Sequence, residues 1–382
     1  MADIGLNQKI SAGSREFHLQ TSTLVEEGMI RTEVFEKGRV LFVANHQFER
    51  RGTDNQSGAE SRVRQFVDKF HQSIIEEIDS LFEISEKIMN ENLPAAHEKL
   101  GQVFLYSHIF DKAERHFQRA LDQESTRYSS YVYLARVYYM QKSYHPAYEI
   151  LEKLRQQGIK YPDLFNLLGL VMLAKSNFRQ AMIYFKEALK KNPGYIEAYY
   201  NLAETILTRL TSLLRTNAET EHKQSLGFLR AILKKVEQNG DIDDRMHSAQ
   251  VLKALQTMDA SKALQLMRER REQQFLRKVP PEVIGYKFFL RLLYSETEMS
   301  KSAMESYERQ ISESLQQNPA FPDLWHYLAL IHLMQCRQHF LDGLDNFREA
   351  TRINPQFEKA LKNLRLVEND GREFLQMIKG IV

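Results

Sequence analysis

Two histidines near the start of the chain are the first candidates for metal chemistry, because imidazole nitrogen is a common ligand of zinc. His18 and His46 have carboxylates close by in sequence, at Glu16 and Glu49. A metal site needs three or four donors at a recognisable spacing, and these four residues show none. We therefore interpret both histidines as structural or surface residues, and we expect neither a metal nor a cofactor.

An acidic run after Asn239-Gly240 is similar to the start of a calcium-binding loop. Asp241, Asp243 and Asp244 supply early carboxylates, but the glycine at the sixth loop position and the glutamate at the twelfth are missing. Such a run is typical of a turn that caps a helix. The chain also lacks a glycine-rich phosphate loop, a Gly-x-Ser-x-Gly elbow and a His-Glu-x-x-His motif. We expect that the protein is not an enzyme.

The densest basic stretch lies between Arg268 and Lys278 and could contact the phosphates of RNA or DNA. Glu269 and Glu272 interleave with its arginines at helical spacing, which favours a solvated, salt-bridged helix face. Over the whole chain 52 Lys and Arg residues balance 50 Asp and Glu residues, so no overall field attracts nucleic acid. A nucleic-acid-binding or regulatory role of the basic 208–278 region stays an alternative, with nucleic acid the less favoured partner.

The single cysteine, Cys336, excludes an internal disulfide and a zinc site built on several thiolates. It lies in the apolar run 330–336, where we expect a buried thiol on a helix. The first residues show no secretory signal, and no window approaches 18 uninterrupted apolar residues. With a mean hydropathy of −0.48, the expectation is a cytoplasmic protein without a membrane span.

The elements that would position these residues are mainly helices, because 382 residues contain only 16 glycines and 9 prolines. Residues 15–50 differ. Short β-type runs around 16–21, 29–35 and 40–44, separated by glycine turns, predict a three-stranded antiparallel meander after a disordered start. Three short strands need a covering element.

The covering element that we expect is the amphipathic helix after the link Gly52–Gly58. Its apolar stripe includes Phe66, Phe70 and Phe82. About 30 residues of helix span roughly 45 Å, more than three short strands can cover. We therefore expect its far end to pack on the first helical repeat or on a second copy of the chain.

The rest of the chain repeats itself every 34 residues. A first series of small residues, each preceded by leucine, comprises Gly101, Ala135, Gly169 and Ala203. A second series, twelve residues later, comprises Ala113, Ala147 and Ala181. Small residues let two antiparallel helices approach closely, and large side chains such as Phe117 and Phe185 fill the gap between them. The spacing predicts stacked helix pairs.

This pattern resembles the tetratricopeptide repeat (TPR) family, whose motif is W-x2-L-G-x2-Y followed by A-x3-F and a proline. Residues 162–195 match best, and 94–127 and 128–161 match in the same phase. Residues 282–318 look like a stretched repeat, and 325–355 look like a further pair with a longer internal spacing. The resemblance implies a mainly α fold: a TPR-like α-solenoid of helix-turn-helix repeats, preceded by a small antiparallel β meander plus a long helix.

We divide the chain into four parts on this basis. Residues 1–58 form the small β module with its disordered start, and residues 59–93 form the long amphipathic connecting helix. Residues 94–240 form TPR-like repeats. Residues 241–380 form irregular helices and C-terminal TPR-like repeats with a capping helix, and we expect one continuous superhelix from about 94 to 380.

In this family, ligands lie along the concave surface lined by the first helix of each repeat. The residues at the lining positions are Glu98, Gln102, Tyr106, Arg136, Tyr139, Met140, Asn166, Leu170, Tyr200 and Glu204. Aromatic side chains and methionine beside Asn, Gln and Arg suit a peptide or helix laid in a groove. The resemblance therefore implies a non-enzymatic scaffold or adaptor, of bacterial type, that binds a protein or peptide partner.

Three further possibilities stay open at this point. The long helices of 208–278 could fill the groove themselves. The N-terminal β module could sense a small ligand, as an alternative function. The protein could also form a homo-oligomer through the 60–90 helix or through the edge strands of the meander, which offer unpaired backbone groups.

Overall fold

The computed structural model describes residues 4–24, 27–47, 56–213, 219–257, 259–273 and 279–381. The chain divides into two compact units. Unit 1 joins residues 1–92 to residues 279–382, and unit 2 comprises residues 93–278. The expected continuous superhelix from about 94 to 380 is therefore not what the structure shows, because the helices after residue 279 group with the N-terminal module.

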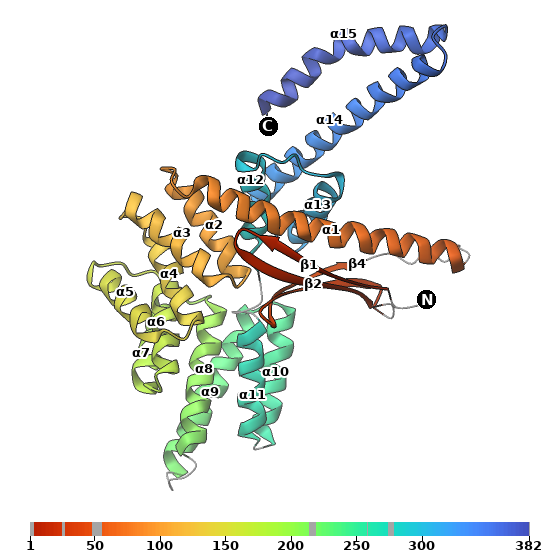
Figure 1. The fold of residues 1–382 in the computed structure, drawn as a ribbon. Coiled ribbons are helices and arrows are strands. Elements are labelled where there is room, and N and C mark those ends of the chain that lie inside the picture. The colour runs from red at the N-terminus through yellow and green to blue at the C-terminus, as the bar shows by residue number, and fades with distance from the viewer. Residues whose placement is uncertain are drawn as a thin grey trace. The chain divides into compact units, whose positions relative to one another are not determined.

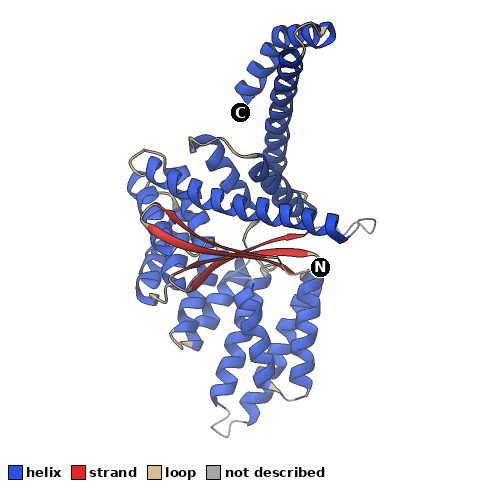
Figure 2. Cartoon of the chain, turned by 45° about the vertical axis from the view of Figure 1, so that its right-hand side comes forward, coloured by secondary structure: helices blue, strands red, loops and turns tan. Residues whose placement is uncertain are grey.

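Four antiparallel strands open unit 1 and pair in sequence order as a meander (Figure 2). They are β1 (Gly5–Ala12), β2 (Arg15–Leu24), β3 (Met29–Glu36) and β4 (Arg39–Gln47). The sequence predicted three strands after a disordered start, so β1 corrects that prediction. The alternation in β1 was hidden by Gln8, a polar residue on the face toward the long helix, where its Oε1 lies 3.1 Å from His71 Nε2. Gly13, at φ +56, makes the turn between β1 and β2.

Helix α1 (Gln56–Ile88) packs on one face of the sheet and contacts β1, β2 and β3 (Figure 1). The apolar sheet residues that are essentially inaccessible to solvent are Phe17, Leu19, Ile30 and Val34. They alternate with more exposed neighbours, as a half-buried sheet requires. The Phe17 ring meets the Phe82 ring of α1 at 5.4 Å. The covering role expected of the long helix is confirmed.

Helices α12 (Pro281–Tyr294) and α13 (Lys301–Gln317) also pack on α1. Lys287 Nζ lies 2.6 Å from Glu77 Oε1, and Arg291 Nη2 lies 3.0 Å from Glu76 Oε2. The Lys287, Glu77 and Arg291 side chains are almost completely buried. The sequence predicted the first repeat or a second copy as the neighbour of α1, and the structure shows α12 and α13 on it.

Helix α14 (Pro322–Ile353) is one uninterrupted helix, where the sequence predicted a helix pair over 325–355. Gly343 is the only strong helix breaker in its second half, and a glycine costs only about 1 kcal/mol in a helix interior. Without a turn the helix continues, so this prediction is wrong.

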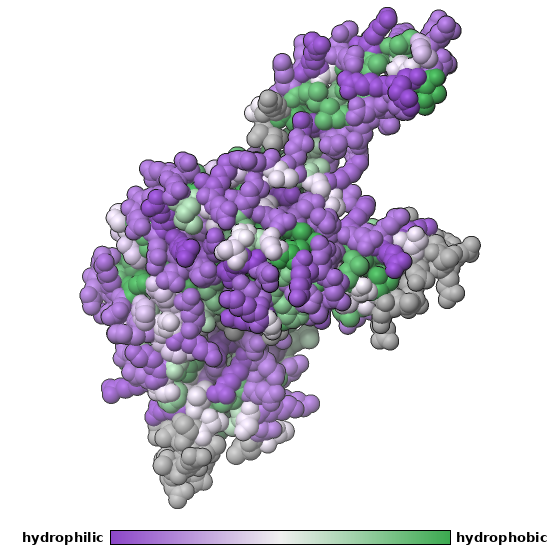
Figure 3. Space-filling view, in the orientation of Figure 1, coloured by the Kyte–Doolittle hydropathy of each residue, from purple (hydrophilic) through white to green (hydrophobic). Residues whose placement is uncertain are grey.

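Helix α15 (Glu358–Ile381) folds back along α14. The centres of the Phe340 and Phe374 rings lie 5.1 Å apart between the two helices. Apolar side chains gather along the facing sides of the hairpin that α14 and α15 form (Figure 3). Cys336 lies on α14 but is exposed. Because α15 covers only one side of α14, the prediction of a buried thiol is wrong.

Unit 2 begins with three helix pairs in the predicted register. They are α2 (Pro94–Tyr106) with α3 (Phe110–Gln123), α4 (Tyr128–Met140) with α5 (Tyr144–Gln156), and α6 (Pro162–Ala174) with α7 (Phe178–Lys191). A Cβ atom added at Gly169 would lie 2.5 Å from the Phe185 ring, and one at Gly101 would lie 2.8 Å from the Phe117 ring. The close approach predicted for the small residues is confirmed.

The backbone repeats with the same period. The turn after each first helix contains a non-glycine residue in the left-handed region, namely His108 at φ 57, Lys142 at φ 62 and Ser176 at φ 59. These positions are 34 residues apart. Because few non-glycine residues adopt this conformation, three in register show that the three hairpins share one turn geometry.

Four helices close unit 2. They are α8 (Ile196–Leu213), α9 (Glu219–Asn239), α10 (Ile242–Gln256) and α11 (Ala260–Arg271). Successive helices pack on one another, and α11 returns to pack on α8. Leu229 and Leu233 of α9, Leu255 of α10 and Met267 of α11 extend the buried core of the repeats.

Candidate functional site

The ten predicted groove residues lie on the first helices of the repeats: α2, α4, α6 and α8. We refer to the surface that carries these ten residues as the first-helix face. Its residues fall into two groups by exposure. Those on α2 and α4 are half-buried apart from Gln102, whereas those on α6 and α8 are buried.

On α2 and α4, the side chains of Tyr106 and Arg136 pair across the two helices. The guanidinium carbon of Arg136 lies 5.1 Å from the centre of the Tyr106 ring, which is a cation–π contact. Tyr139 and Met140 follow at the end of α4, both half-buried. This part of the face therefore presents aromatic, cationic and thioether groups together.

Glu98, also on α2, is engaged by the start of the next repeat. Its Oε2 accepts hydrogen bonds from Ser129 Oγ at 2.6 Å and Ser130 Oγ at 2.5 Å, and Arg127 Nη1 lies 3.7 Å away. Since a charged acceptor strengthens these bonds, Glu98 fixes the entry of α4 against α2. Gln102, one turn further on, is only 4% exposed.

Asn166 of the face, on α6, bonds to polar residues in and just before α8 that are not among the ten. Asn166 Oδ1 accepts a hydrogen bond from Asn201 Nδ2 at 2.9 Å, and Asn166 Nδ2 donates to Tyr195 Oη at 3.4 Å. Leu170, one turn beyond Asn166, is completely buried. These contacts lock α6 to α8, so this stretch serves the packing of the solenoid.

Helix α11 occupies the α8 end of the face. Arg271 Nε lies 3.3 Å from Glu204 Oε2 and Arg268 Nε lies 3.9 Å from Glu204 Oε1. Arg271 Nη1 also donates to Tyr139 Oη at 3.4 Å. The guanidinium of Arg270 stacks 3.6 Å from the centre of the Tyr200 ring. The sequence left open whether helices of 208–278 fill the groove. At this end of the face, α11 does so.

Arg268, Arg270 and Arg271 of the basic stretch are thus engaged inside unit 2. Arg270 Nη2 also pairs with Asp244 Oδ1 at 2.5 Å, and both side chains are nearly buried. Burial raises the pKa of the Glu204 carboxyl, while the charges of Arg271 and Arg268 oppose that rise. Sequence reasoning missed these partners because the glutamates between the arginines made α11 look like a solvated helix.

The acidic run at Asp241 and the candidate metal ligand His46 have structural roles in capping and packing. Asp241 caps α10, because its Oδ1 accepts a hydrogen bond from the Asp244 backbone N–H at 2.8 Å, as the acidic run predicted. The His46 ring stacks 5.3 Å from the Phe70 ring, and burial together with the nearby Arg309 lowers the pKa of His46 to about 4. Glu49 lies outside the described residues.

No group of three or more His, Cys, Asp or Glu side chains in the described residues could hold a metal ion. None of the described helices combines the length and the hydrophobicity that a membrane span requires.

No protein-family model matches the chain, and no curated protein matches it. Among solved structures, YrrB, described as a TPR protein with an unusual peptide-binding site, is 13% identical. That match covers 64% of this chain and 96% of YrrB, with a TM-score of 0.32. TTC0263, a TPR protein of Thermus thermophilus, is 19% identical over 63% of this chain and 99% of its own, with a TM-score of 0.32.

A third similar structure is PilF of Pseudomonas aeruginosa, which is 14% identical. The match covers 63% of this chain and 98% of PilF, with a TM-score of 0.35. These likenesses concern the fold alone. The assignment rests on the chain's own 34-residue period in sequence and backbone, and on the small residues that seat the rings of the second helices. The chain is a TPR-like α-solenoid protein with a small N-terminal antiparallel β meander and a long helix.

Proposed function

We propose that the protein is a non-enzymatic interaction scaffold, an adaptor that binds a peptide or helix of a partner protein on the α2–α4 part of the first-helix face. The observation that carries this proposal is the cluster of Tyr106, Arg136, Tyr139 and Met140. Rings, a guanidinium and a thioether lie there together and half-buried. Tyr and Arg dominate binding energy at protein interfaces, because they bury large areas while keeping polar groups in reach.

The chemistry of this surface suggests how a partner is held. The Tyr106 ring and the stacked Arg136 guanidinium form a flat platform for an apolar or aromatic side chain. The positive charge of Arg136 also favours an acidic partner segment. Met140 supplies an adaptable apolar contact. Because α11 already contacts Glu204, Tyr200 and, through Arg271, the Tyr139 hydroxyl, the partner segment lies over Tyr106, Arg136 and Met140.

The test compares face variants with a matched control. Tyr106→Ala and Arg136→Ala remove the platform, whereas Tyr161→Ala removes a tyrosine that is 59% exposed just before α6 and is not one of the ten face residues. Full-length variants would be used to capture partners from cells that produce the protein, and circular dichroism would check folding. We expect each face variant to weaken partner binding at least tenfold, equivalent to about 1.4 kcal/mol.

Two results would contradict the proposal. One is a partner that binds the face variants as tightly as the unmodified chain. The other is a loss of binding caused by Tyr161→Ala and not by the face variants. We further propose that the protein works in the reducing cytoplasm. The lone thiol of Cys336 is exposed, and an exposed free thiol is readily oxidised in oxidising compartments.

A further inference from the structure

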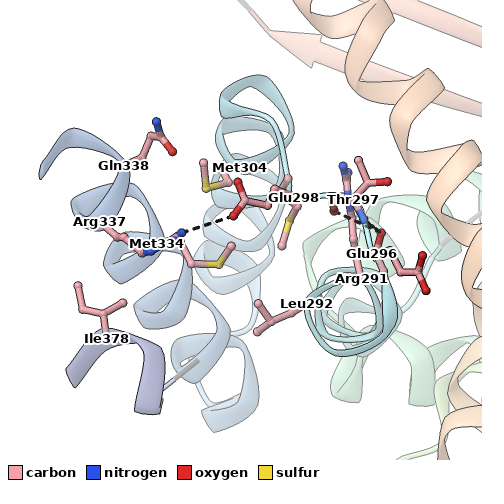
Figure 4. Close-up of a pocket in the computed structure, with 12 residues that line it drawn as sticks. Arg291, Leu292, Glu296, Thr297, Glu298, Met304, Met334, Arg337, Gln338 and Ile378 are labelled. Atoms are coloured by element: carbon pink, nitrogen blue, oxygen red, sulfur yellow. Dashed lines mark hydrogen bonds and ion pairs between the residues drawn. The ribbon is translucent and has the colours of Figure 1, made fainter. Parts of the chain in front are cut away.

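A cavity of about 350 Å³ lies within unit 1, between α12, α13, α14 and the end of α15 (Figure 4). Its apolar lining comes from Leu292, Met299, Met304, Met334 and Ile378. The volume is in the range of sites for small ligands. Three methionines make the wall adaptable, because unbranched thioether chains change conformation at low cost. The cavity therefore suits a slender apolar group.

One side of the cavity carries a loosely held guanidinium. Arg337 Nη1 lies 3.8 Å from Glu298 Oε1, and these two lining residues are joined in Figure 4. The Glu298 side chain is 87% exposed and that of Arg337 is 44% exposed. Exposed pairs at this distance contribute little to stability. Another carboxylate can therefore replace Glu298 at Arg337 with little loss.

A second guanidinium lines the same cavity and is buried. The Arg291 side chain is 3% exposed, and its Nη2 pairs with Glu76. Its Nε and Nη1 are inaccessible to solvent, and the buried Tyr307 hydroxyl lies within hydrogen-bonding reach of this guanidinium. Arg291 therefore offers a ligand in the cavity a positive charge behind the lining and no direct hydrogen bond.

The acidic residues of the lining do not reverse this balance. Glu296 Oε1 lies 3.2 Å from Lys87 Nζ, and Glu298 pairs with Arg337. Each carboxylate thus has a cation beside it. Arg337 is the guanidinium of the lining that stays accessible, so a carboxylate is the head group that can pair with it.

We propose that this cavity binds a medium-chain aliphatic carboxylate. Its head group pairs with Arg337 in place of Glu298, and its chain lies among the three methionines. Arg291 adds positive potential from below the lining. This site is independent of partner binding on the first-helix face, since every residue that forms it belongs to unit 1.

The experiment uses the full chain labelled with carbon-13 at the methionine methyl groups. Titration with decanoate is expected to shift the signals of Met299, Met304 and Met334 in a saturable way. The signals of Met140 and Met182, which belong to unit 2, serve as internal references and should stay in place. Decanol and decyltrimethylammonium carry the same chain without the negative charge, and we expect them to bind at least tenfold more weakly.

A pair of arginine variants on α14 separates the head-group contact from general charge. Arg337→Gln should weaken decanoate binding about tenfold or more. Arg348→Gln, on the same helix, removes a guanidinium that pairs with Asp345 and Glu368 and does not line the cavity. It should leave binding unchanged.

The inference is overturned if decanoate causes no saturable shift at the three methionines. It is also overturned if decanol binds as tightly as decanoate, because the cavity would then be an apolar hole without anion selectivity. Equal affinities of the Arg337→Gln variant and the unmodified chain would exclude Arg337 as the head-group partner and contradict the proposal in the same way.

Discussion

Replacing Gly169 with alanine tests the packing of the solenoid most sharply. The new Cβ would lie 2.5, 2.6 and 2.8 Å from three carbons of the Phe185 ring, closer than Cβ atoms approach other groups in proteins. Phe185 is completely buried, so the ring has no open space to move into. Overpacking of this kind costs up to about 3 kcal/mol. Alanine regains about 1 kcal/mol of helix propensity, which leaves a net destabilisation of roughly 2 kcal/mol.

Two glycines provide matched comparisons in the same unit. At Gly101 the contact with Phe117 begins at 2.8 Å, so Gly101→Ala should cost less than Gly169→Ala. Gly227 lies exposed in α9 with nothing within 4 Å of its added Cβ. Gly227→Ala should therefore stabilise the protein by about 0.4–1 kcal/mol.

Urea denaturation followed by circular dichroism measures these differences. A double variant, Gly169→Ala with Phe185→Leu, removes the ring that the new methyl group strikes, so the two changes should couple by more than about 0.5 kcal/mol. If Gly169→Ala were as stabilising as Gly227→Ala, α6 and α7 would not approach as closely as the structure shows, and the packing argument would fail.

Three further predictions concern charge, pH and accessibility. Lys287→Met leaves the buried Glu77 carboxylate without its cation and should destabilise unit 1 by about 3–5 kcal/mol. Faster hydrogen exchange of the α12 amides would report this loss of stability, and undiminished protection of those amides would contradict the buried pair. Burial, with His97 and Lys112 nearby, lowers the pKa of His116 from 6.5 to about 3. The unfolded chain then binds the proton more readily than the folded chain. The contribution of His116 to the free energy of unfolding is therefore complete above pH 6.5 and falls by about 2 kcal/mol by pH 5. Urea titrations should show a weaker pH dependence in His116→Leu, and an identical one would refute the assignment. Cys336 should react with a thiol reagent in the native state, and labelling only after denaturation would place it in a core.

The repeats could be predicted from the sequence because each one encodes its own packing. Gly101 and Gly169 recur with the leucines that precede them, and the rings of Phe117 and Phe185 follow at a fixed distance. Such contacts lie within one helix pair, so a short stretch of sequence contains both partners. The three hairpins from α2 to α7 follow that register.

The joining of the N-terminal and C-terminal segments in unit 1 could not be predicted in the same way. Its joining contacts run from Glu76 and Glu77 on α1 to Lys287 and Arg291 on α12, more than 200 residues away. Charged residues on a helix are usually a solvated face, and periodicity alone does not reveal when they are buried in pairs. The first-helix face posed the same difficulty, because the partners of Glu204 lie on α11.

Site-specific photo-crosslinking tests the central claim, that the α2–α4 part of the first-helix face binds a partner protein. A photoreactive phenylalanine analogue would replace Tyr106 in one variant and the exposed Tyr161 in another, and both would be irradiated in cells. We predict a crosslinked partner from position 106, none from position 161, and loss of the crosslink when Arg136→Ala is added. A partner that crosslinks only at position 161, or one that still crosslinks at position 106 despite Arg136→Ala, would contradict the account.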